Sequence, residues 1–275
     1  MTKKTVASKA VRLILLLACS GIFLFPLYLA LVNALGDWYS PPALVPKVWN
    51  WENYAYATSL IDFWRYTRNS LILSGITVIL STLSSGISGY AFARIKAPGK
   101  NILFMLVLST MMLPGIVTQI PTYVLFYKFN ILNTYLPWVF WGIGGNAFYI
   151  FMYRQFFLSL PPELEEAARI DGCSIFKTYW RIILPVSIPA AATVGILTFH
   201  GSWNDVVSPF MYLREEKYPL ATALSMIGYM ASGSTQVITQ VSVAAGLILA
   251  VPIIATFFVG QRYIVQGIVT TGLKS

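Results

Sequence analysis

Residues 161–185 read PPELEEAARIDGCSIFKTYWRIILP and predict two short helices joined by a turn. A proline in the first turn of a helix loses no intrahelical hydrogen bond, and the glutamates that follow the paired prolines suit the positive end of a helix dipole. Gly172 is suited to end the first helix because glycine adopts a left-handed cap without steric cost. Ser174 is a favourable N-cap for a second helix from Ile175 to about Ile183. Neither helix is long enough to cross a bilayer, so this hairpin must lie against lipid headgroups, the rest of the chain or another protein.

Long uncharged runs surround the hairpin. Of the 275 residues, 57% are hydrophobic and 11% are charged, whereas about a quarter of the residues of an ordinary soluble domain are charged. This composition excludes a water-soluble globular protein. A membrane-spanning helix needs about 20 mostly apolar residues, and each run can supply one. We therefore predict an all-α polytopic membrane protein, with one transmembrane domain over residues 1–275 and six spans, at about 13–36, 69–93, 101–127, 131–153, 185–205 and 237–261.

The distribution of basic residues predicts the orientation in the membrane. The net charge is +9 at pH 7, and most of the 19 lysines and arginines fall in segments on one side of the predicted spans. Cytoplasmic loops carry such an excess of basic residues. The pattern predicts that both termini and loop 154–184 are cytoplasmic, and that segments 37–68 and 206–236 are external. Because the basic charge is explained by topology, we expect no nucleic-acid partner.

The second predicted span carries a small residue at every fourth position. Thr77, Ser81, Ser85, Gly89 and Ala93 therefore lie along one face of a helix. Such a stripe lets a second helix approach closely in lipid. Small residues are also common in membrane helices generally, so an interpretation by composition alone stays open.

The hairpin resembles a loop of a known family. Glu166-Ala167-Ala168, three residues, Gly172, nine residues, Ile182, one residue and Leu184-Pro185 match the EAA signature loop of permease subunits from binding-protein-dependent ABC importers. The match falls between the fourth and fifth predicted spans, as in that family. Cys173 departs from the family, which usually has alanine there.

Other segments are similar to the carbohydrate-uptake branch of this family, in particular to the smaller permease of the maltose and glycerol-phosphate systems. These segments are Ser202-Trp203-Asn204-Asp205, Tyr218-Pro219-Leu220, Gln261–Gly267 and Thr271–Lys274. His200 stands where the branch usually has an apolar or small residue. It is interpreted either as a residue of substrate specificity or as a polar packing contact.

The resemblance implies a type I ABC importer permease fold and a division of labour. Such a permease pairs with a second permease subunit above two copies of an ATP-binding cassette ATPase, and an external solute-binding protein delivers the carbohydrate. The assembly is surrounded by the lipid of the bacterial inner, or cytoplasmic, membrane. The sequence has no Gly-x-x-x-x-Gly-Lys-Ser/Thr phosphate loop. We expect this chain to be no enzyme and to bind no cofactor or metal, while ATP with Mg binds to the ATPase partner.

The resemblance also implies which residues couple this chain to the ATPase. The second helix of the hairpin is expected to sit in a cleft of the ATPase, Glu166 to make a charged contact, and Gly172 to fix the turn. The expected coupling residues are Glu166, Ala167, Ala168, Asp171, Gly172, Tyr179, Ile182, Leu184 and Pro185. The cytoplasmic tail offers a second candidate contact through Gln261, Arg262, Gly267 and Gly272. A solvated chain end is the alternative for the tail.

Polar residues of the fifth predicted span are candidates for the substrate path. Polar groups within a membrane are costly and usually face a cavity or a partner. His200, Asn204 and Ser208 are spaced to share one helix face, and Trp203 is suited to stack on the C–H face of a sugar ring. Asp205 adjoins them. In a second interpretation, which stays open, the Trp-Asn-Asp motif is a structural corner at the outer edge of the membrane.

A secondary, ion-coupled transporter is the main alternative function. Such proteins commonly show internal repeats and membrane-buried acidic groups. The sequence shows no convincing repeat, and Asp205 is the only acidic residue near the interior of a predicted span. A membrane-embedded enzyme is a remoter alternative, because the sequence contains no Ser/His/Asp constellation.

Overall fold

A computed structural model describes residues 3–226, 229 and 237–272 of the chain. Every regular element within these ranges is a helix, which confirms the all-α prediction. The chain divides into two compact units. The first unit comprises residues 1–65 and 223–251, and the second comprises residues 66–222 and 252–275.

The first unit is organised around a buried amide. Asn53, at the start of α2 (Glu52–Ser59), is fully buried, and its Nδ2 donates to the carbonyls of Ala34 and Gly36 at 2.8 Å each. Its Oδ1 accepts from Nε1 of Trp38 at 2.9 Å. Because buried polar groups are stable only when paired, this network fixes the chain between α1 (Lys3–Ala34) and α2. One cluster of buried apolar residues in this unit comprises Ala34, Ala57, Tyr229, Ile238, Val241, Ala244 and Ala245.

Helix α1 presents its apolar side chains outward. Its stretch Val11–Ala34 is long and apolar enough to cross a membrane, and none of its most apolar window is buried. A continuous apolar surface of this size is stable only against lipid or another protein. The helix is therefore adapted to a bilayer.

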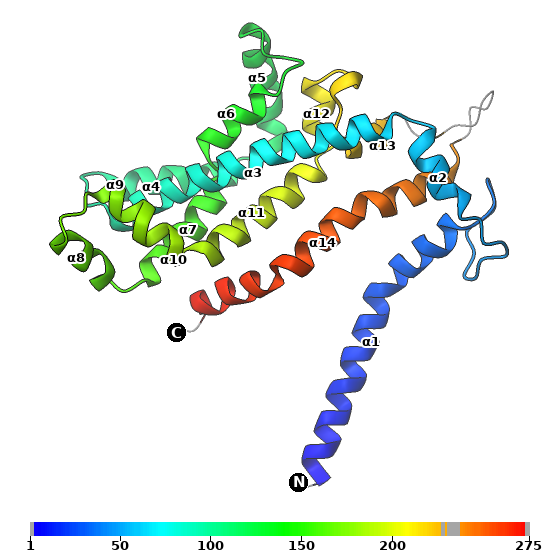
Figure 1. Cartoon of the computed structure of the whole chain (residues 1–275), viewed down its shortest axis with the longest axis horizontal. Helices are drawn as coiled ribbons and strands as arrows, with labels where there is room; N and C mark the ends of the chain where they lie inside the picture. The colour runs from blue at the N-terminus through cyan, green and yellow to red at the C-terminus, as the bar shows by residue number, and fades with distance from the viewer. Residues whose placement is uncertain (1–2, 227–228, 230–236, 273–275) are drawn as a thin grey trace. The chain divides into compact units, whose positions relative to one another are not determined.

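The second unit contains most of the helices. In Figure 1, α8, α9 and α10 gather near one end of α3, and α12 lies toward its other end. Its elements are α3 (Phe63–Arg94), α4 (Lys100–Ser109), η1 (Thr110–Met112), α5 (Gly115–Lys128), α6 (Leu136–Gly144), α7 (Ala147–Ser159), α8 (Glu163–Ile170), α9 (Ile175–Thr178), η2 (Tyr179–Ile183), α10 (Leu184–Val186), α11 (Ile188–Trp203), α12 (Val207–Tyr212), η3 (Glu215–Lys217), α13 (Leu220–Met226) and α14 (Thr239–Gly272). Three of these helices, α3, α13 and α14, extend into both units.

Two residues of the small-residue stripe of α3, Ser85 and Gly89, lie close to α7 and its N-cap. A Cβ atom added at Gly89 would stand 2.5 Å from Cβ of Tyr153 and 3.1 Å from the carbonyl oxygen of Ile150. Four residues earlier along the stripe, Oγ of Ser85 accepts from the backbone N–H of Asn146 at 3.1 Å. The two backbones can approach closely because no larger side chain separates them.

Two of the expected spans are bent pairs of helices. α4 with η1 meets α5 at 100°, and the helices on either side of Ser187 meet at 77°. Leu113, before Pro114, is extended, as a residue before proline tends to be. At the second bend, Pro189 has no N–H to donate to the residue four positions earlier. The expected fifth span therefore begins as α11 at Ile188, and Pro185 lies in α10 before the bend.

The expected fourth span is also broken. α6 ends at Gly144, and the next residue, Gly145, has a φ of +71°. α7 begins after Asn146, whose side chain accepts from the N–H groups of Phe148 and Tyr149. Among the described residues, α1, α3 and α14 each contain a stretch long and apolar enough to span a membrane, and the number rises to five if each bent pair forms one span.

Candidate functional site

The predicted hairpin is present in the second unit. α8 begins after Pro162, and Gly172, with φ of +72°, adopts the left-handed conformation that the turn requires. Oγ of Ser174 accepts from the backbone N–H of Lys177 at 3.3 Å. The cap and the turn are thus confirmed, and they set the geometry between α8 and α9.

The second helix of the hairpin changes its winding midway. α9 passes at Tyr179 into the π-helical turn η2, which shifts the register of the side chains that follow. Tyr179 and Ile183 are buried, and the ring of Tyr179 lies 5.1 Å from that of Tyr90 in α3. Ile182 and Leu184 are half-buried against the same core. Ile175, which the spacing assigns to the same face as Tyr179, is 60% exposed.

The glutamates of α8 have different surroundings. Glu165 forms an ion pair with Arg94, with 3.4 Å between Oε1 and Nε, and both side chains are largely buried. Glu163 and Glu166 are exposed. The sequence names Glu166 as a coupling residue but gives no sign that its neighbour turns inward.

The hairpin also carries exposed apolar side chains outside this packing. Ile170 is 87% exposed and Phe176 is 70% exposed. Ala167 and Asp171 are exposed beside them, whereas Ala168 is buried within the unit. Of the two alanines among the expected coupling residues, only Ala167 is therefore exposed.

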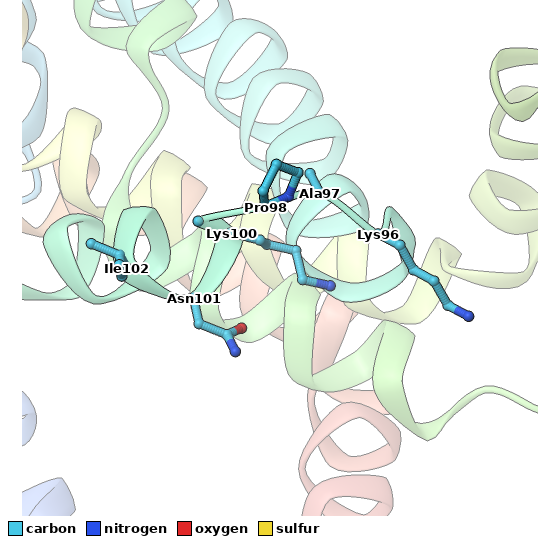
Figure 2. Close-up of a pocket in the computed structure, with 7 residues that line it drawn as sticks. Lys96, Ala97, Pro98, Lys100, Asn101 and Ile102 are labelled. Carbon is cyan, nitrogen blue, oxygen red and sulfur yellow. The ribbon is translucent and has the colours of Figure 1, made fainter.

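The α3–α4 turn forms an open basic depression. It has a volume of about 640 Å³ and includes Pro98 and Gly99. Figure 2 shows the side chains of Lys96 and Lys100 extending from this turn to the same side. A smaller cavity of about 290 Å³ lies between α3 and the hairpin, lined by Tyr90, Arg94, Ile95, Lys96, Glu165, Arg169, Cys173, Ile175 and Thr178.

A third cavity, of about 370 Å³, lies among the helices of the second unit and combines aromatic with polar side chains. We call it the polar cavity, and its lining residues are Thr77, Ser81, Trp138, Trp141, Gly142, Gly145, Asn146, Tyr149, Thr198, Gly201, Ser202, Asp205 and Ser208. Hydroxyl, amide and carboxylate groups beside indole rings can hydrogen-bond and stack a polyhydroxylated ligand.

Two of the five candidate residues of the substrate path line the polar cavity. They are Asp205 and Ser208, and Oδ1 of Asp205 accepts from the N–H of Ser208 at 3.0 Å. The predicted shared face for His200, Asn204 and Ser208 is wrong, because α11 ends at Trp203 and Ser208 belongs to α12. Ser208 reaches the cavity through the turn instead.

The other three candidates lie outside the lining of the cavity. Nε2 of His200 lies 3.0 Å from Oγ1 of Thr256 in α14, a polar contact between helices. Trp203 is 1% exposed, and its ring stacks on Phe199 with 5.2 Å between centroids. Nδ2 of Asn204 donates to the carbonyl of His200. These contacts favour the interpretation of the motif as a structural corner.

Sequence reasoning missed the aromatic wall of the polar cavity. The ring centroids of Trp138 and Trp141 lie 5.6 Å apart, and behind this wall the ring of Tyr212, which does not line the cavity, lies 5.3 Å from that of Trp141. Burial raises the pKa of Tyr212, and the nearby carboxylate of Asp205 raises it further. Two tryptophans three positions apart in an otherwise apolar run are the available signal, because they fall on one helix face.

The candidate residues of the tail lie in α14. Gln261 and Arg262 are exposed, and Arg262 donates to the hydroxyl of Tyr263 at 2.7 Å. Gly267 and Gly272 belong to the last turns of the helix, beyond the residues whose side chains are described. No cluster of three or more His, Cys, Asp or Glu residues suited to a metal ion occurs in the part of the chain that the structure describes.

Comparison with known proteins gives consistent matches. Residues 84–270 match the model of the family described as "Binding-protein-dependent transport system inner membrane component". The chain is 32% identical over 233 residues to the arabinooligosaccharides transport system permease protein AraQ of Halalkalibacterium halodurans, which covers 83% of this chain and 81% of that protein. It is 31% identical over 263 residues to the sn-glycerol-3-phosphate transport system permease protein UgpE of Yersinia enterocolitica, with 90% and 91% covered.

Two further matches extend over nearly the whole chain. The probable starch degradation products transport system permease protein AmyC of Thermoanaerobacterium thermosulfurigenes is 30% identical, with 93% of each chain covered. A crystal structure of a bacterial ABC transporter involved in the import of the acidic polysaccharide alginate contains a chain that matches with a TM-score of 0.82. That match has 21% identity and covers 96% of this chain and 98% of the other, so the two chains share a fold.

Proposed function

This chain belongs to the family of inner membrane components of binding-protein-dependent transport systems, as a permease subunit of the carbohydrate ABC importer type, and we propose that it forms half of the translocation pathway for a carbohydrate. The observation that carries this proposal is the hairpin, which combines a packed inner face with exposed apolar side chains. A membrane protein that used the hairpin only for its own packing would not need Ile170 and Phe176 exposed.

The exposed side chains of the hairpin are proposed to dock on the ATPase. Ile170 and Phe176 supply apolar contacts, and Glu166 and Asp171 supply charge beside them. Tyr179, Ile182 and Leu184 would act from within by packing the hairpin on the core, and Pro185, which is exposed in α10, would lead the chain toward α11. Ala167 allows close approach, Ala168 packs inward and Gly172 holds the turn. In this way closure of the ATPase would move the helices that surround the polar cavity.

The proposed topology has six spans with both termini in the cytoplasm of a bacterium. Two contacts at opposite ends of α3 support it. Arg94 pairs with the hairpin, while Nδ2 of Asn69 donates to the carbonyls of Glu216 and Tyr218 in the segment predicted to be external. At ~1.5 Å per residue these two positions are about 37 Å apart along the helix, and the hydrocarbon core of a bilayer is about 30 Å thick.

The proposed partners are a second permease, two ATPase subunits, an external solute-binding protein and membrane lipid. ATP with Mg would be bound and hydrolysed by the ATPase subunits. The exposed residues Gln261 and Arg262 are proposed as a second contact with the ATPase, together with Gly267 and Gly272.

The substrate is proposed to pass through the polar cavity. Its hydroxyl, amide and carboxylate groups would hydrogen-bond sugar hydroxyls, and Trp141, which is partly exposed, would contact the C–H face of a sugar ring. The names of the relatives concern arabinooligosaccharides, glycerol phosphate and starch degradation products, and they support an oligosaccharide or a related compound. His200, Trp203 and Asn204 would support the path indirectly, through the corner that ends α11.

Purification of the tagged chain from its native membrane in a mild detergent tests this assignment. We expect an ATPase and a second permease to co-purify, and ATP hydrolysis to rise when the loaded solute-binding protein is added. Carbohydrate transport by this chain alone, driven by an ion gradient, would contradict the proposal and indicate a secondary transporter.

A further inference from the structure

Arg94, the last residue of α3, binds three groups that belong to two other helices and the loop between them. Its Nη2 donates to the carbonyls of Phe157 at 2.7 Å and Leu160 at 2.6 Å, at the end of α7. Its Nε lies 3.4 Å from Oε1 of Glu165 in the first turn of α8. The two charged side chains are 15% and 16% exposed, so solvent screens their attraction only weakly.

The helix ends around Arg94 explain why a cation is held there. The last carbonyls of a helix lack intrahelical partners and form the negative end of its dipole, which favours a guanidinium at the end of α7. The first turn of α8 is the positive end of that helix, which favours the carboxylate of Glu165. One side chain therefore ties α3 and α7 to the start of the hairpin.

The other groups around Glu165 reinforce this arrangement. Tyr90 lines the same small cavity as Glu165. Lys96 and Arg169 line the same small cavity as Arg94. Three cations thus share a cavity with one carboxylate, and removing that carboxylate would leave an uncompensated positive charge on a largely buried arginine.

We propose that Arg94 is the positioning residue that fastens the coupling hairpin to the transmembrane helices through its ion pair with Glu165. This inference rests on the proposed function, in which the hairpin transmits motion from an ATPase. A hairpin released from α3 and α7 would still meet the ATPase through its exposed side chains but would transmit less of the movement. Loss of the pair should therefore lower the number of carbohydrate molecules transported for each ATP hydrolysed.

The test uses the assembled importer with the variants E165Q, R94K and E163Q. E165Q keeps the shape of the side chain and removes its charge, R94K keeps a cation without the planar fork, and E163Q removes an exposed charge from the same turn of α8. Two quantities are measured: the ratio of transport to ATP hydrolysis in proteoliposomes, and hydrogen–deuterium exchange of the backbone amides of residues 163–170.

For E165Q we expect exchange in α8 to rise about tenfold or more, because removing one partner of a buried ion pair is strongly destabilising. The transport ratio should fall severalfold while ATP hydrolysis persists. R94K should lie between E165Q and wild type, and E163Q should match wild type. E165Q with wild-type values for both quantities, or E163Q as defective as E165Q, would overturn the proposal.

The variants also separate this proposal from the function on which it rests. If E165Q does not assemble, R94K decides: wild-type values overturn the proposal, and reduced coupling supports it. Exchange in α8 is measurable on the full chain without an ATPase, so a failure of the importer assignment leaves that comparison intact. A working importer in which loss of the pair changes neither exchange in α8 nor the transport ratio would refute the role of Arg94 and leave the proposed function intact.

Discussion

The close approach of α3 and α7 at Gly89 allows a quantitative prediction for Gly89→Ala. The new Cβ would stand 2.5 Å from Cβ of Tyr153 and 3.1 Å from two backbone atoms, N of Arg154 and O of Ile150. Carbon atoms in contact are normally about 3.5–4.0 Å apart, so the two helices would have to separate by about 1 Å or more. Overpacking of this kind costs about 1–3 kcal/mol, and the backbone contact indicates the upper part of that range. Alanine regains about 1 kcal/mol through its higher helix propensity, so the free energy of unfolding should fall by about 2 kcal/mol.

Gly75→Ala is the matched control for this prediction. Gly75 lies in the same helix, and a Cβ added there meets nothing within 4 Å. It should gain about 0.5–1 kcal/mol from helix propensity alone. The two variants should thus differ by about 3 kcal/mol, or roughly 6–12 °C in Tm for a chain of this size. Thermal unfolding of the two purified variants in the same detergent measures the difference. Gly89→Ala with a Tm equal to or above that of Gly75→Ala would refute the close packing of α3 on α7.

Three further predictions concern the site. Gly172→Leu should strain the turn by about 1–2 kcal/mol through its positive φ, since a Cβ added there meets no atom within 4 Å. It should weaken ATPase co-purification severalfold, and unchanged association and transport would contradict the role of the turn. Trp141→Ala should raise the KM for carbohydrate by about tenfold through loss of stacking. Phe140 is an exposed neighbour that does not line the cavity, so Phe140→Ala should leave the KM unchanged. Equal KM values for the two variants would show that Trp141 does not contact the substrate. His200→Ala should cost about 1 kcal/mol of stability through the lost contact with Thr256 and leave substrate preference unchanged, so an altered preference in competition assays would show that His200 acts on the substrate.

The local features of the hairpin were predictable from the sequence because they depend on adjacent residues. A glycine that must adopt positive φ and a serine that caps the next turn are recognised within a few positions, and both are present at Gly172 and Ser174. The helical nature of the chain follows in the same way from the long uncharged runs. Composition indicates these elements without any knowledge of what each helix contacts.

The breaks in the helices were less predictable. The run 131–153 contains no charged residue, yet the chain turns at Gly145 and starts a new helix with Asn146 as its N-cap. Hydropathy sums over a window and does not register one left-handed residue. The end of α11 at Trp203 was missed for the same reason. Ser208 therefore belongs to α12, although helical spacing placed it on one face with His200.

Contacts between distant segments were beyond the reach of spacing arguments. Arg94 and Glu165 are far apart in sequence, and no local pattern at either position predicts that they pair. The three glutamates of α8 have the same chemistry, and only the fold distinguishes the one that turns inward. The polar cavity likewise collects residues from α3, α6, α7, α11 and α12, so no single stretch of sequence describes it.

The most direct test of the proposed function is carbohydrate uptake by the reconstituted complex. The chain is placed in proteoliposomes with its second permease and its ATPase, with the loaded solute-binding protein on one side and ATP with Mg on the other. We predict uptake of labelled oligosaccharide that requires both ATP and the binding protein and that stops when this chain is omitted. Uptake that continues without ATP, or without this chain, would contradict its assignment as a permease subunit of an ATP-driven carbohydrate importer.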